Sequence, residues 1–354
     1  MSDLGVPGWL LKLVMAFLKN RTMRVRYRGK LSSIFSLAGG GPQGTLLGLF
    51  LFLVLIDDAG FCDQMNNAGE LITKKKIKEM NIIHLKYVDD LSLAESVDMT
   101  SLSHVPRDVR PQPDMYRART GHVLDLKKSK VFQQLKETQE YAKQNHMKLN
   151  LSKTKLMLFN PCTSRDFMPE MRIEGTRLDL VEQSKLLGVV LTSNLSWSAN
   201  TEYIVERCMK KMWVMRRLKK LGASSTDLLE IYYKQIRCIA EYAAPVWSSA
   251  ITMEDSRKLE RIQKVACNII LGENYESYTA ATKSLGLEKL NERRKRICMK
   301  FAKKSQKHIK FSKWFKPAPA LNTRLKKPRF YNVFSKTVRF EKSPISYLTE
   351  LLNQ

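Results

Sequence analysis

The chain is 354 residues long, is 44% hydrophobic and carries a formal net charge of +27. This hydrophobic content is enough for a buried core, which excludes a globally disordered chain, and the length allows two or three domains. The longest apolar run, Leu46–Ile56, has 11 residues, and a membrane-spanning helix needs about 20. No secretory leader opens the sequence. We therefore expect no transmembrane segment and an intracellular location, in the nucleus or the cytoplasm.

The cysteines also indicate an intracellular protein. The chain has 6 cysteines, and they are far apart without a C-x-x-C pair, so neither a zinc ribbon nor a disulfide framework is predicted. We interpret them as buried thiols in a reducing compartment. The 5 histidines show no metal-binding spacing and are assigned no role.

Positive charge is concentrated in the second half of the chain. Residues 201–354 hold 33 Lys and Arg against 14 Asp and Glu, whereas residues 1–200 hold 28 against 20. This imbalance indicates a polyanionic partner, most simply nucleic acid. Charge alone does not separate a nucleic-acid-binding protein from a merely soluble basic protein or from a ribosome-like passenger.

The first elements alternate between helix and strand patterns. Apolar residues at helical spacing predict a helix over 4–20, and Arg24–Phe35 has strand character with Gly29 as its turn. Gly39–Pro42 predicts a flexible loop that ends in a stiff corner. The apolar run Leu46–Ile56 follows at once and predicts a buried helix.

An acidic pair lies in the next informative stretch. Two short apolar segments flank Asp89 and Asp90 within Ile82–Leu93, a pattern typical of a hairpin with carboxylates in its turn. His104–Pro113 is rich in Pro, Arg and Asp and shows no periodicity. We expect an exposed insert there, over about residues 97–128.

Short elements are predicted between this insert and residue 197. Val131–His146 has a helical pattern, Leu156–Phe159 is a strand candidate, and the apolar residues around Gly175 suggest a small hairpin. Leu186–Leu191 is predicted to be a further strand.

From Ser198 onward the apolar spacing is helical. The predicted buried faces are Ile204, Cys208 and Met212; Leu229, Tyr232, Ile236 and Ile239; and Leu259, Ile262, Ala266 and Ile269. The opposite faces carry Lys210, Lys211, Arg217, Lys219, Lys220, Lys258 and Arg261. Such helices can pack inward and contact phosphate outward, although a solvated charged face is the alternative for any single helix. Beyond Pro317 we expect a loosely ordered basic stretch, followed by a short helix over Ile345–Leu352.

Asp89 and Asp90 are the candidate metal ligands. Two adjacent carboxylates in a tight turn cannot both ionise comfortably without a counter-charge. A hard divalent cation supplies one, and Mg²⁺ typically takes one or two carboxylates together with substrate phosphates. An isolated Asp-Asp pair, however, is most often an ordinary surface turn, because Asp favours turns for backbone reasons.

Other motifs accompany the acidic pair in a fixed order. They are Gly41-Pro-Gln-Gly-Thr45, the apolar segment Leu46–Phe52, Tyr87-Val-Asp-Asp90, Asn150 with Lys153 and Lys155, and Leu187-Gly-Val189. This ensemble, which extends over nearly the whole chain, resembles reverse transcriptases and most closely those of non-LTR (LINE-type) retrotransposons. The segments Glu241–Trp247 and Leu259–Gln263 also look like the region after the palm in these elements, and are weaker signals.

The resemblance implies a role for each matching residue. Asp89 and Asp90 are the expected catalytic and metal-binding carboxylates, with Mg²⁺ or Mn²⁺ as the metal. Lys153, rather than Lys155, is expected near the triphosphate, where it could protonate the leaving pyrophosphate. Gly41, Pro42, Gln43, Gly44 and Thr45 are expected to approach the templating base and the nucleotide, because glycine permits close backbone approach. Tyr87, Leu187 and Gly188 are expected on the primer side, where Leu187, Gly188 and Val189 would form the turn that grips the primer.

The sequence departs from the family pattern upstream of these motifs. Family members carry a further carboxylate in a Phe-x-Asp strand segment before the helix that here ends near Arg21. Asp3 is the only acid before Gly41, and no strand pattern surrounds it. The fingers and an endonuclease domain are not recognised either. Asp57-Asp58, which replaces the usual Asn-Asp, is interpreted as structural, and Val88 in place of alanine is a mild change.

Together these features predict an α+β fold in three parts. Residues 1–197 form a partial reverse transcriptase palm, an antiparallel ferredoxin-like sheet with helices on one face. Residues 198–310 form a helical thumb-like region, and residues 311–354 form a basic tail. The expected function is RNA-directed DNA polymerase, present as a truncated fragment that is inactive alone. Its partners are an RNA template, a DNA primer or RNA–DNA hybrid, and deoxynucleoside triphosphates, with no membrane. The alternatives are a catalytically silent nucleic-acid-binding remnant and an unstable product with no role.

Overall fold

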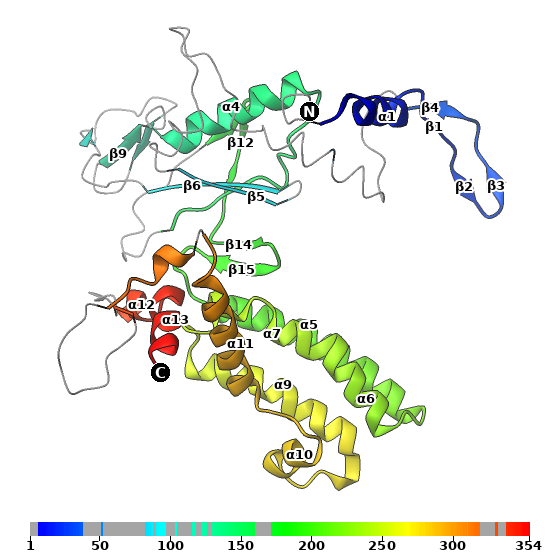
Figure 1. Cartoon of the computed structure of the whole chain (residues 1–354), viewed down its shortest axis with the longest axis vertical. Coiled ribbons are helices and arrows are strands. Elements are labelled where there is room, and N and C mark those ends of the chain that lie inside the picture. The colour runs from blue at the N-terminus through cyan, green and yellow to red at the C-terminus, as the bar shows by residue number, and fades with distance from the viewer. Residues whose placement is uncertain are drawn as a thin grey trace. The chain divides into compact units, whose positions relative to one another are not determined.

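The computed structural model has a mixed α+β architecture whose second half is mostly helical (Figure 1). It describes residues 6–37, 51, 82–87, 90–96, 103–104, 115–117, 122–125, 129–159, 171–309, 311–318, 330–331 and 338–354. Packing divides the chain into two compact units. The first is Met1–Lys155 with Ser164–Asp179, and the second is Leu156–Thr163 with Leu180–Gln354.

The described residues of the first unit form short antiparallel strands and two helices. Its elements are α1 (Gly8–Leu18), β1 (Thr22–Met23), β2 (Arg26–Tyr27), β3 (Lys30–Leu31), β4 (Phe35–Ser36), β5 (Ile82–Tyr87), β6 (Asp90–Glu95), β7 (Ser103–His104), β8 (Met115–Arg117), β9 (His122–Asp125), α4 (Lys130–Gln144), β11 (Arg172–Ile173) and β12 (Thr176–Arg177). The short strands β10 (Lys155–Leu156) and β13 (Asp179–Leu180) form a further pair. The predicted helix over 4–20, the turn at Gly29, the hairpin around Gly175 and the helix over 131–146 are confirmed.

The β5–β6 hairpin and α4 form the best-defined part of this unit. All six residues of β5 pair with β6, from Ile82 opposite Glu95 to Tyr87 opposite Asp90. At the far end of β6, the Glu95 carboxylate accepts hydrogen bonds from the Ser129 hydroxyl and from the backbone N–H of Lys130, the latter at 2.8 Å. Ser129 is also the N-cap of α4. The start of this helix is therefore fixed to the end of the strand that begins with Asp90.

The insert between β6 and α4 contains strands that the sequence did not predict. β7, β8 and β9 form a three-stranded antiparallel sheet with β9 in the middle. β9 has the sequence His122-Val-Leu-Asp125, and its two adjacent apolar residues are too short a run to stand out from the irregular surroundings. The expected exposed loop over His104–Pro113 lies outside the described residues, apart from His104 in β7.

The second unit is a hairpin followed by a helical domain. Its elements are β14 (Gln183–Leu186), β15 (Val189–Thr192), α5 (Ser198–Lys220), α6 (Ser225–Ile231), the π-helix η4 (Tyr232–Arg237), α7 (Cys238–Glu241), α8 (Ala244–Trp247), α9 (Met253–Leu271), η5 (Gly272–Asn274), α10 (Tyr278–Ser284), α11 (Leu290–Ser305), η6 (Ser312–Trp314), α12 (Val338–Glu341) and α13 (Pro344–Asn353). Within the described residues, no helix is both long enough and apolar enough to cross a membrane.

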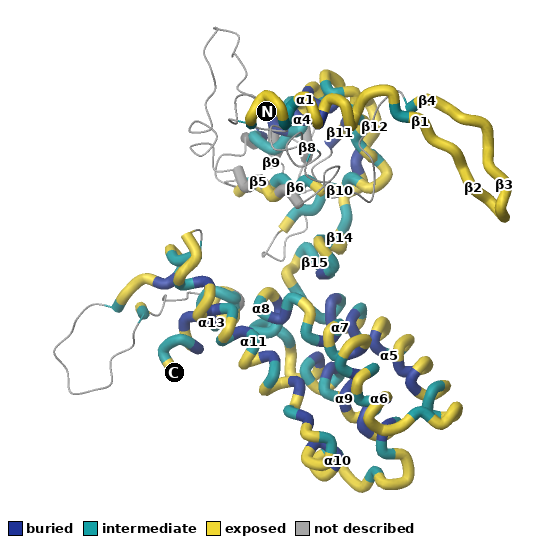
Figure 2. The backbone as a smooth tube through the Cα atoms, turned by 45° about the vertical axis from the view of Figure 1, so that its right-hand side comes forward, coloured by how far each residue is buried: buried dark blue, intermediate teal, exposed yellow. Residues whose placement is uncertain are grey.

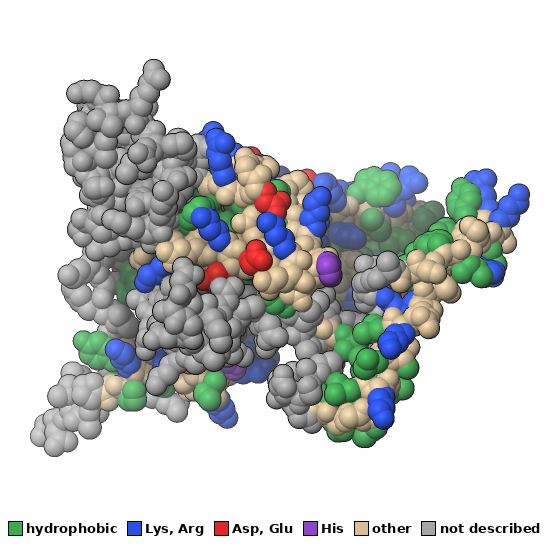
Figure 3. Space-filling view, turned by 90° about the horizontal axis from the view of Figure 1, so that it is seen from above, with side chains coloured by type: hydrophobic (Ala, Val, Ile, Leu, Met, Phe, Trp, Pro, Cys, Tyr) green, Lys and Arg blue, Asp and Glu red, His purple; other side chains and the backbone are tan. Residues whose placement is uncertain are grey.

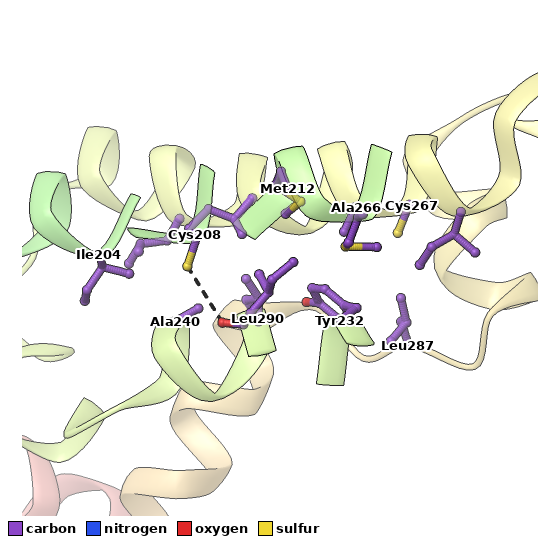
Figure 4. Packing of buried hydrophobic residues seen from close by; sticks show 14 of the residues in the cluster. Ile204, Cys208, Met212, Tyr232, Ala240, Ala266, Cys267, Leu287 and Leu290 are labelled. Atoms are coloured by element: carbon purple, nitrogen blue, oxygen red, sulfur yellow. Dashed lines mark hydrogen bonds between the residues drawn. The ribbon is translucent and has the colours of Figure 1, made fainter. Parts of the chain in front are cut away.

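The core of this unit lies between α5, the α6–η4–α7 segment, α9 and α11 (Figure 4). Ile204, Cys208 and Met212 are buried on one face of α5, as predicted. The indole of Trp247 is fully buried, and its Nε1 donates to the carbonyl of Tyr242 at 2.9 Å. Burial of apolar side chains at this density stabilises the unit by roughly 1.5–3 kcal/mol for each large residue.

The helical segment before Glu241 deviates from the predicted face. Its buried residues are Leu228, Tyr232, Ile236 and Ala240, whereas the predicted Leu229 and Ile239 are only partly buried. The buried residues recur every four positions, more widely than the 3.6 of an α-helix. The π-turn η4 explains the difference, because i→i+5 bonding widens the repeat.

The C-terminal helix packs on the helical domain. Leu348 and Leu351 of α13 are buried together with Cys298 and Ala302 of α11 and with Phe315, in a second apolar cluster. The predicted helix over Ile345–Leu352 is confirmed, and Ser343 caps its start by accepting from the N–H of Ser346. The final residues therefore belong to the second unit, in contrast to the loosely ordered stretch expected just after Pro317.

Candidate functional site

Asp90 is the described member of the acidic pair. It is the first residue of β6, it lies opposite Tyr87, the last residue of β5, and its side chain is exposed. The antiparallel register places the start of β6 at the turn of the hairpin, as the sequence predicted. Val88 and Asp89 lie outside the described residues, and the side chain of Tyr87 is not described. Asp90 is thus presented at the tip of a regular strand pair.

The predicted loop that approaches the template lies outside the described residues. Gly41, Pro42, Gln43, Gly44 and Thr45 are not described, and the same is true of Asp57 and Asp58. The roles of these residues remain predictions from the sequence.

The described residues bring one carboxylate to the tip of the hairpin. No cluster of three or more His, Cys, Asp or Glu side chains suited to a metal ion occurs among them. The next carboxylate along β6, Glu95, lies at the opposite end of the strand, where Ser129 and Lys130 occupy it. The oxygen chemistry of an Asp89–Asp90 pair suits Mg²⁺, but the described residues alone do not form a metal site.

Lys153 and Lys155 differ in their surroundings. Lys153 lies in an exposed turn. Its backbone N–H donates to two oxygens of Asn150, the carbonyl oxygen at 3.1 Å and Oδ1 at 3.2 Å. The Nζ of Lys155 lies 2.6 Å from an Asp179 oxygen, and this hydrogen bond lowers the pKa of the Asp179 carboxyl. Among the described residues Lys155 is therefore ion-paired, whereas Lys153 has no ion pair.

Leu187 and Gly188 form the turn of the β14–β15 hairpin. Their φ angles are +46° and +87°, which is the combination required by a two-residue type I′ turn. The sequence predicted one strand over Leu186–Leu191, and this was wrong, because the left-handed pair reverses the chain after Leu186. The turn implied by the resemblance is confirmed.

The Glu241–Trp247 segment holds this turn against the helical domain. The Tyr242 hydroxyl donates to the Leu187 carbonyl at 2.8 Å, and a Cβ added to Gly188 would lie 3.1 Å from Cε1 of the Tyr242 ring. Next to it, Glu241 forms a two-point ion pair with Arg293 of α11, whose Nη2 donates at 3.0 Å. The sequence singled out this segment without predicting its contact with Leu187 and Gly188.

The hairpin belongs by packing to the second unit. Val189 lies in the main apolar core, and the backbone N–H of Val190 donates to Asn200 Oδ1 of α5 at 3.0 Å. The candidate residues thus fall into two groups. Asp90 and Lys153 lie in the first unit, and Leu187 and Gly188 lie in the second.

Exposed cations are frequent on both units. Arg24, Arg26, Arg28 and Lys30 are exposed along the β1–β4 ribbon, and Arg207, Lys210, Lys211, Arg216, Arg217 and Lys220 are exposed on α5. On the face shown in Figure 3, Lys and Arg side chains are scattered widely, with few Asp and Glu between them. Such a surface can bind a polyanion.

Comparison with known proteins gives one distant match. No family model matches the chain. A protein described as "Probable RNA-directed DNA polymerase from transposon BS", from Drosophila melanogaster, is 24% identical over 311 residues. The match covers 85% of this chain and 30% of that protein. The chain therefore spans about a third of the length of the curated relative that it matches.

Proposed function

We propose that this chain is the palm-to-thumb part of an RNA-directed DNA polymerase of a non-LTR retrotransposon. The observation that carries the proposal is the β5–β6 hairpin with Asp90 at its turn, preceded in the sequence by Gly41–Thr45. The distant match to the transposon BS protein supports the same assignment. The substrates are an RNA template, a DNA primer and deoxynucleoside triphosphates.

In this proposal the carboxylates of Asp89 and Asp90 hold Mg²⁺ or Mn²⁺. The metal, when bound, would supply charge stabilisation for phosphoryl transfer to a primer 3′-hydroxyl. The exposed position of Asp90 leaves its oxygens free for a cation. In the proposal, the ammonium group of Lys153 neutralises phosphate charge and donates a proton to the leaving pyrophosphate.

The remaining residues position nucleic acid. The backbone at Gly44 allows close approach of the nucleotide, because glycine has no Cβ. Tyr87 and the Leu187–Gly188 turn contact the primer strand. Tyr242 keeps the turn in place through its hydrogen bond to Leu187. The basic outer surfaces of the helices follow the phosphate backbone.

We further propose that the 354 residues alone do not catalyse extension. The palm mechanism uses a carboxylate from an earlier strand, and Asp3 is the only acid of this sequence before Gly41. Catalysis depends on the position of the metal ions, so the loss of one bridging carboxylate should remove most of the activity. Primer extension on an RNA template with Mg²⁺ or Mn²⁺ is the test. Robust extension that disappears in Asp89→Ala would support the polymerase and contradict the inactivity.

A second candidate function is nucleic-acid binding without catalysis. It is favoured by the excess of Lys and Arg over Asp and Glu in residues 201–354, 33 against 14. Binding through phosphates releases counterions, so affinity should fall steeply between 50 and 200 mM salt, by roughly 10³-fold for six or more contacts. A flat salt response of hybrid binding would count against both candidates.

A further inference from the structure

The outer face of α5 combines cations with two aromatic rings, of which Trp213 is exposed and Tyr203 is half-buried. From Arg207 to Lys220 the helix carries seven Lys and Arg and no Asp or Glu. Trp213 lies within this stretch with 61% of its surface exposed. The opposite face is fully buried at Cys208 and Met212. The helix therefore packs against the core on one side and is exposed on the other (Figure 2). A large exposed indole is uncommon among tryptophans, which are highly buried on average.

Two rings on this face are already paired with cations. The Arg217 guanidinium carbon lies 5.5 Å from the centre of the Trp213 ring. The Tyr203 ring has Lys185 Nζ at 4.9 Å and the Arg207 guanidinium carbon at 5.5 Å. Contacts of this length are within the range of cation–π attraction. The rings are therefore pre-ordered, and each is bordered by positive charge.

The spacing along the helix makes these groups one surface. Ten residues separate Tyr203 from Trp213, which is about 15 Å at 1.5 Å per residue. Lys210 and Arg217 are separated by seven residues, or about two turns, and so share a face, with Lys210 one turn before Trp213 and Arg217 one turn after it. We call Tyr203, Arg207, Lys210, Trp213 and Arg217 the α5 stacking face.

We infer that the α5 stacking face binds unpaired nucleotides, with a base stacked on the Trp213 indole and phosphates at Lys210 and Arg217. The inference rests on the proposed function, which supplies the nucleic acid. The row of cations complements phosphates. Lys210 is paired with Glu206 at 2.6 Å, but both side chains are largely exposed, so this pair is weak in water and a phosphate can replace it. An exposed indole offers a stacking surface that accepts any base, but only a base that is not already stacked within a duplex. The face therefore fits a single strand better than a blunt duplex.

Anisotropy of a labelled 20-nucleotide oligo(dT) and of a blunt 20-base-pair duplex, measured on the full chain, tests this. Trp213→Ala should weaken oligo(dT) binding by about fivefold or more and duplex binding by less than about twofold. Trp213→Phe retains a ring and should stay within about twofold of the parent on both probes. Val214→Ala, an exposed apolar neighbour on the same helix, is the matched control and should change neither.

Each outcome decides the inference. Equal weakening of both probes by Trp213→Ala, no weakening of either, or a loss in Trp213→Phe as large as in Trp213→Ala would overturn stacking. In these cases the parent still binds, so the proposed function stands. A parent chain that binds neither probe would overturn both. Circular dichroism of each variant verifies the helical content, which an exposed substitution should leave unchanged.

Discussion

The hydroxyl of Tyr242 donates a 2.8 Å hydrogen bond to the carbonyl of Leu187, 55 residues earlier in the chain. This bond joins the Glu241–Trp247 segment to the turn of the β14–β15 hairpin. Both partners come from motifs that resemble those of reverse transcriptases. The contact gives the weaker motif a physical purpose, which is to fix the position of the turn proposed to contact the primer.

Tyr242→Phe should release the turn without unfolding the helical domain. Removal of the hydroxyl leaves the Leu187 carbonyl without this donor and should lower the free energy of unfolding by about 1 kcal/mol. Amide exchange at residues 187–190 should accelerate, while exchange in the core of α5 should not. Tyr331→Phe, at a tyrosine that is 52% exposed, is the control. Unchanged exchange at the turn in Tyr242→Phe would contradict the docking role.

Gly188→Ala should be more costly than Gly222→Ala. Both glycines have φ +87°, so both substitutions carry a left-handed backbone cost of roughly 1–2 kcal/mol. Only at Gly188 does an added Cβ meet another side chain, at 3.1 Å from the Tyr242 ring, whereas Gly222 has nothing within 4 Å. Thermal melting of the two variants isolates the contact. Equal destabilisation of the two variants would show that the Tyr242 ring moves aside at no cost in free energy, and would contradict the prediction.

Glu241→Gln should destabilise the domain through the loss of a shielded ion pair. The side chains of Glu241 and Arg293 are only 14% and 17% exposed, and the hydrogen bond that Arg293 donates to the carboxylate raises the pKa of Arg293. Arg293 then keeps only its longer pair with Glu288, at 3.9 Å, and the loss of the Glu241 charge should cost about 2–4 kcal/mol. Glu206→Gln is the control, because its pair with Lys210 is 63% and 73% exposed and is worth at most about 0.5 kcal/mol. Chemical denaturation measures both, and similar values would contradict the shielding.

The buried thiols should resist alkylation and make the fold sensitive to high pH. Burial raises the pKa of Cys208 to about 12 and that of Cys298 to about 11, from 9.0. Between pH 9 and the raised pKa values, the native state therefore retains these protons and the unfolded chain loses them. The contribution of the two thiols to the free energy of unfolding is fully present below pH 9 and is lost as pH rises toward 11–12. Iodoacetamide at pH 8 should modify Cys238, which is exposed, and spare the other two. Mass spectrometry that finds all three labelled equally in the folded chain would contradict this.

The elements predicted best are those whose signal is local. The β5–β6 hairpin and the buried face of α5 follow from alternation and helical spacing, which depend on neighbouring residues alone. The turn at Leu187 could not be read from apolar pattern, because Leu186–Leu191 is continuously apolar apart from Gly188. The resemblance predicted it, since that glycine tolerates the positive φ.

The elements predicted poorly depend on distant or irregular contacts. The π-turn η4 shifts the buried face from Leu229 and Ile239 to Leu228 and Ala240, and apolar spacing assumes a regular helix. The hydrogen bond from Tyr242 to Leu187 joins two segments whose order along the chain gives no sign of contact. The strands β7 to β9 are too short for their pattern to stand out.

RNA-templated primer extension tests the central claim most directly, in a chain that also contains the earlier carboxylate that the proposed mechanism requires. A chimera places a palm segment with the Phe-x-Asp strand of the family pattern before residues 1–354, and Asp89→Asn and Lys155→Gln are made in the same chimera. The account predicts that the chimera extends the primer in the presence of Mg²⁺. Asp89→Asn should abolish this extension. Lys155→Gln should leave it largely intact, because Lys155 is already paired with Asp179. A folded chimera that binds the RNA–DNA hybrid and does not extend it, or that extends it equally with Asp89→Asn, would contradict the account.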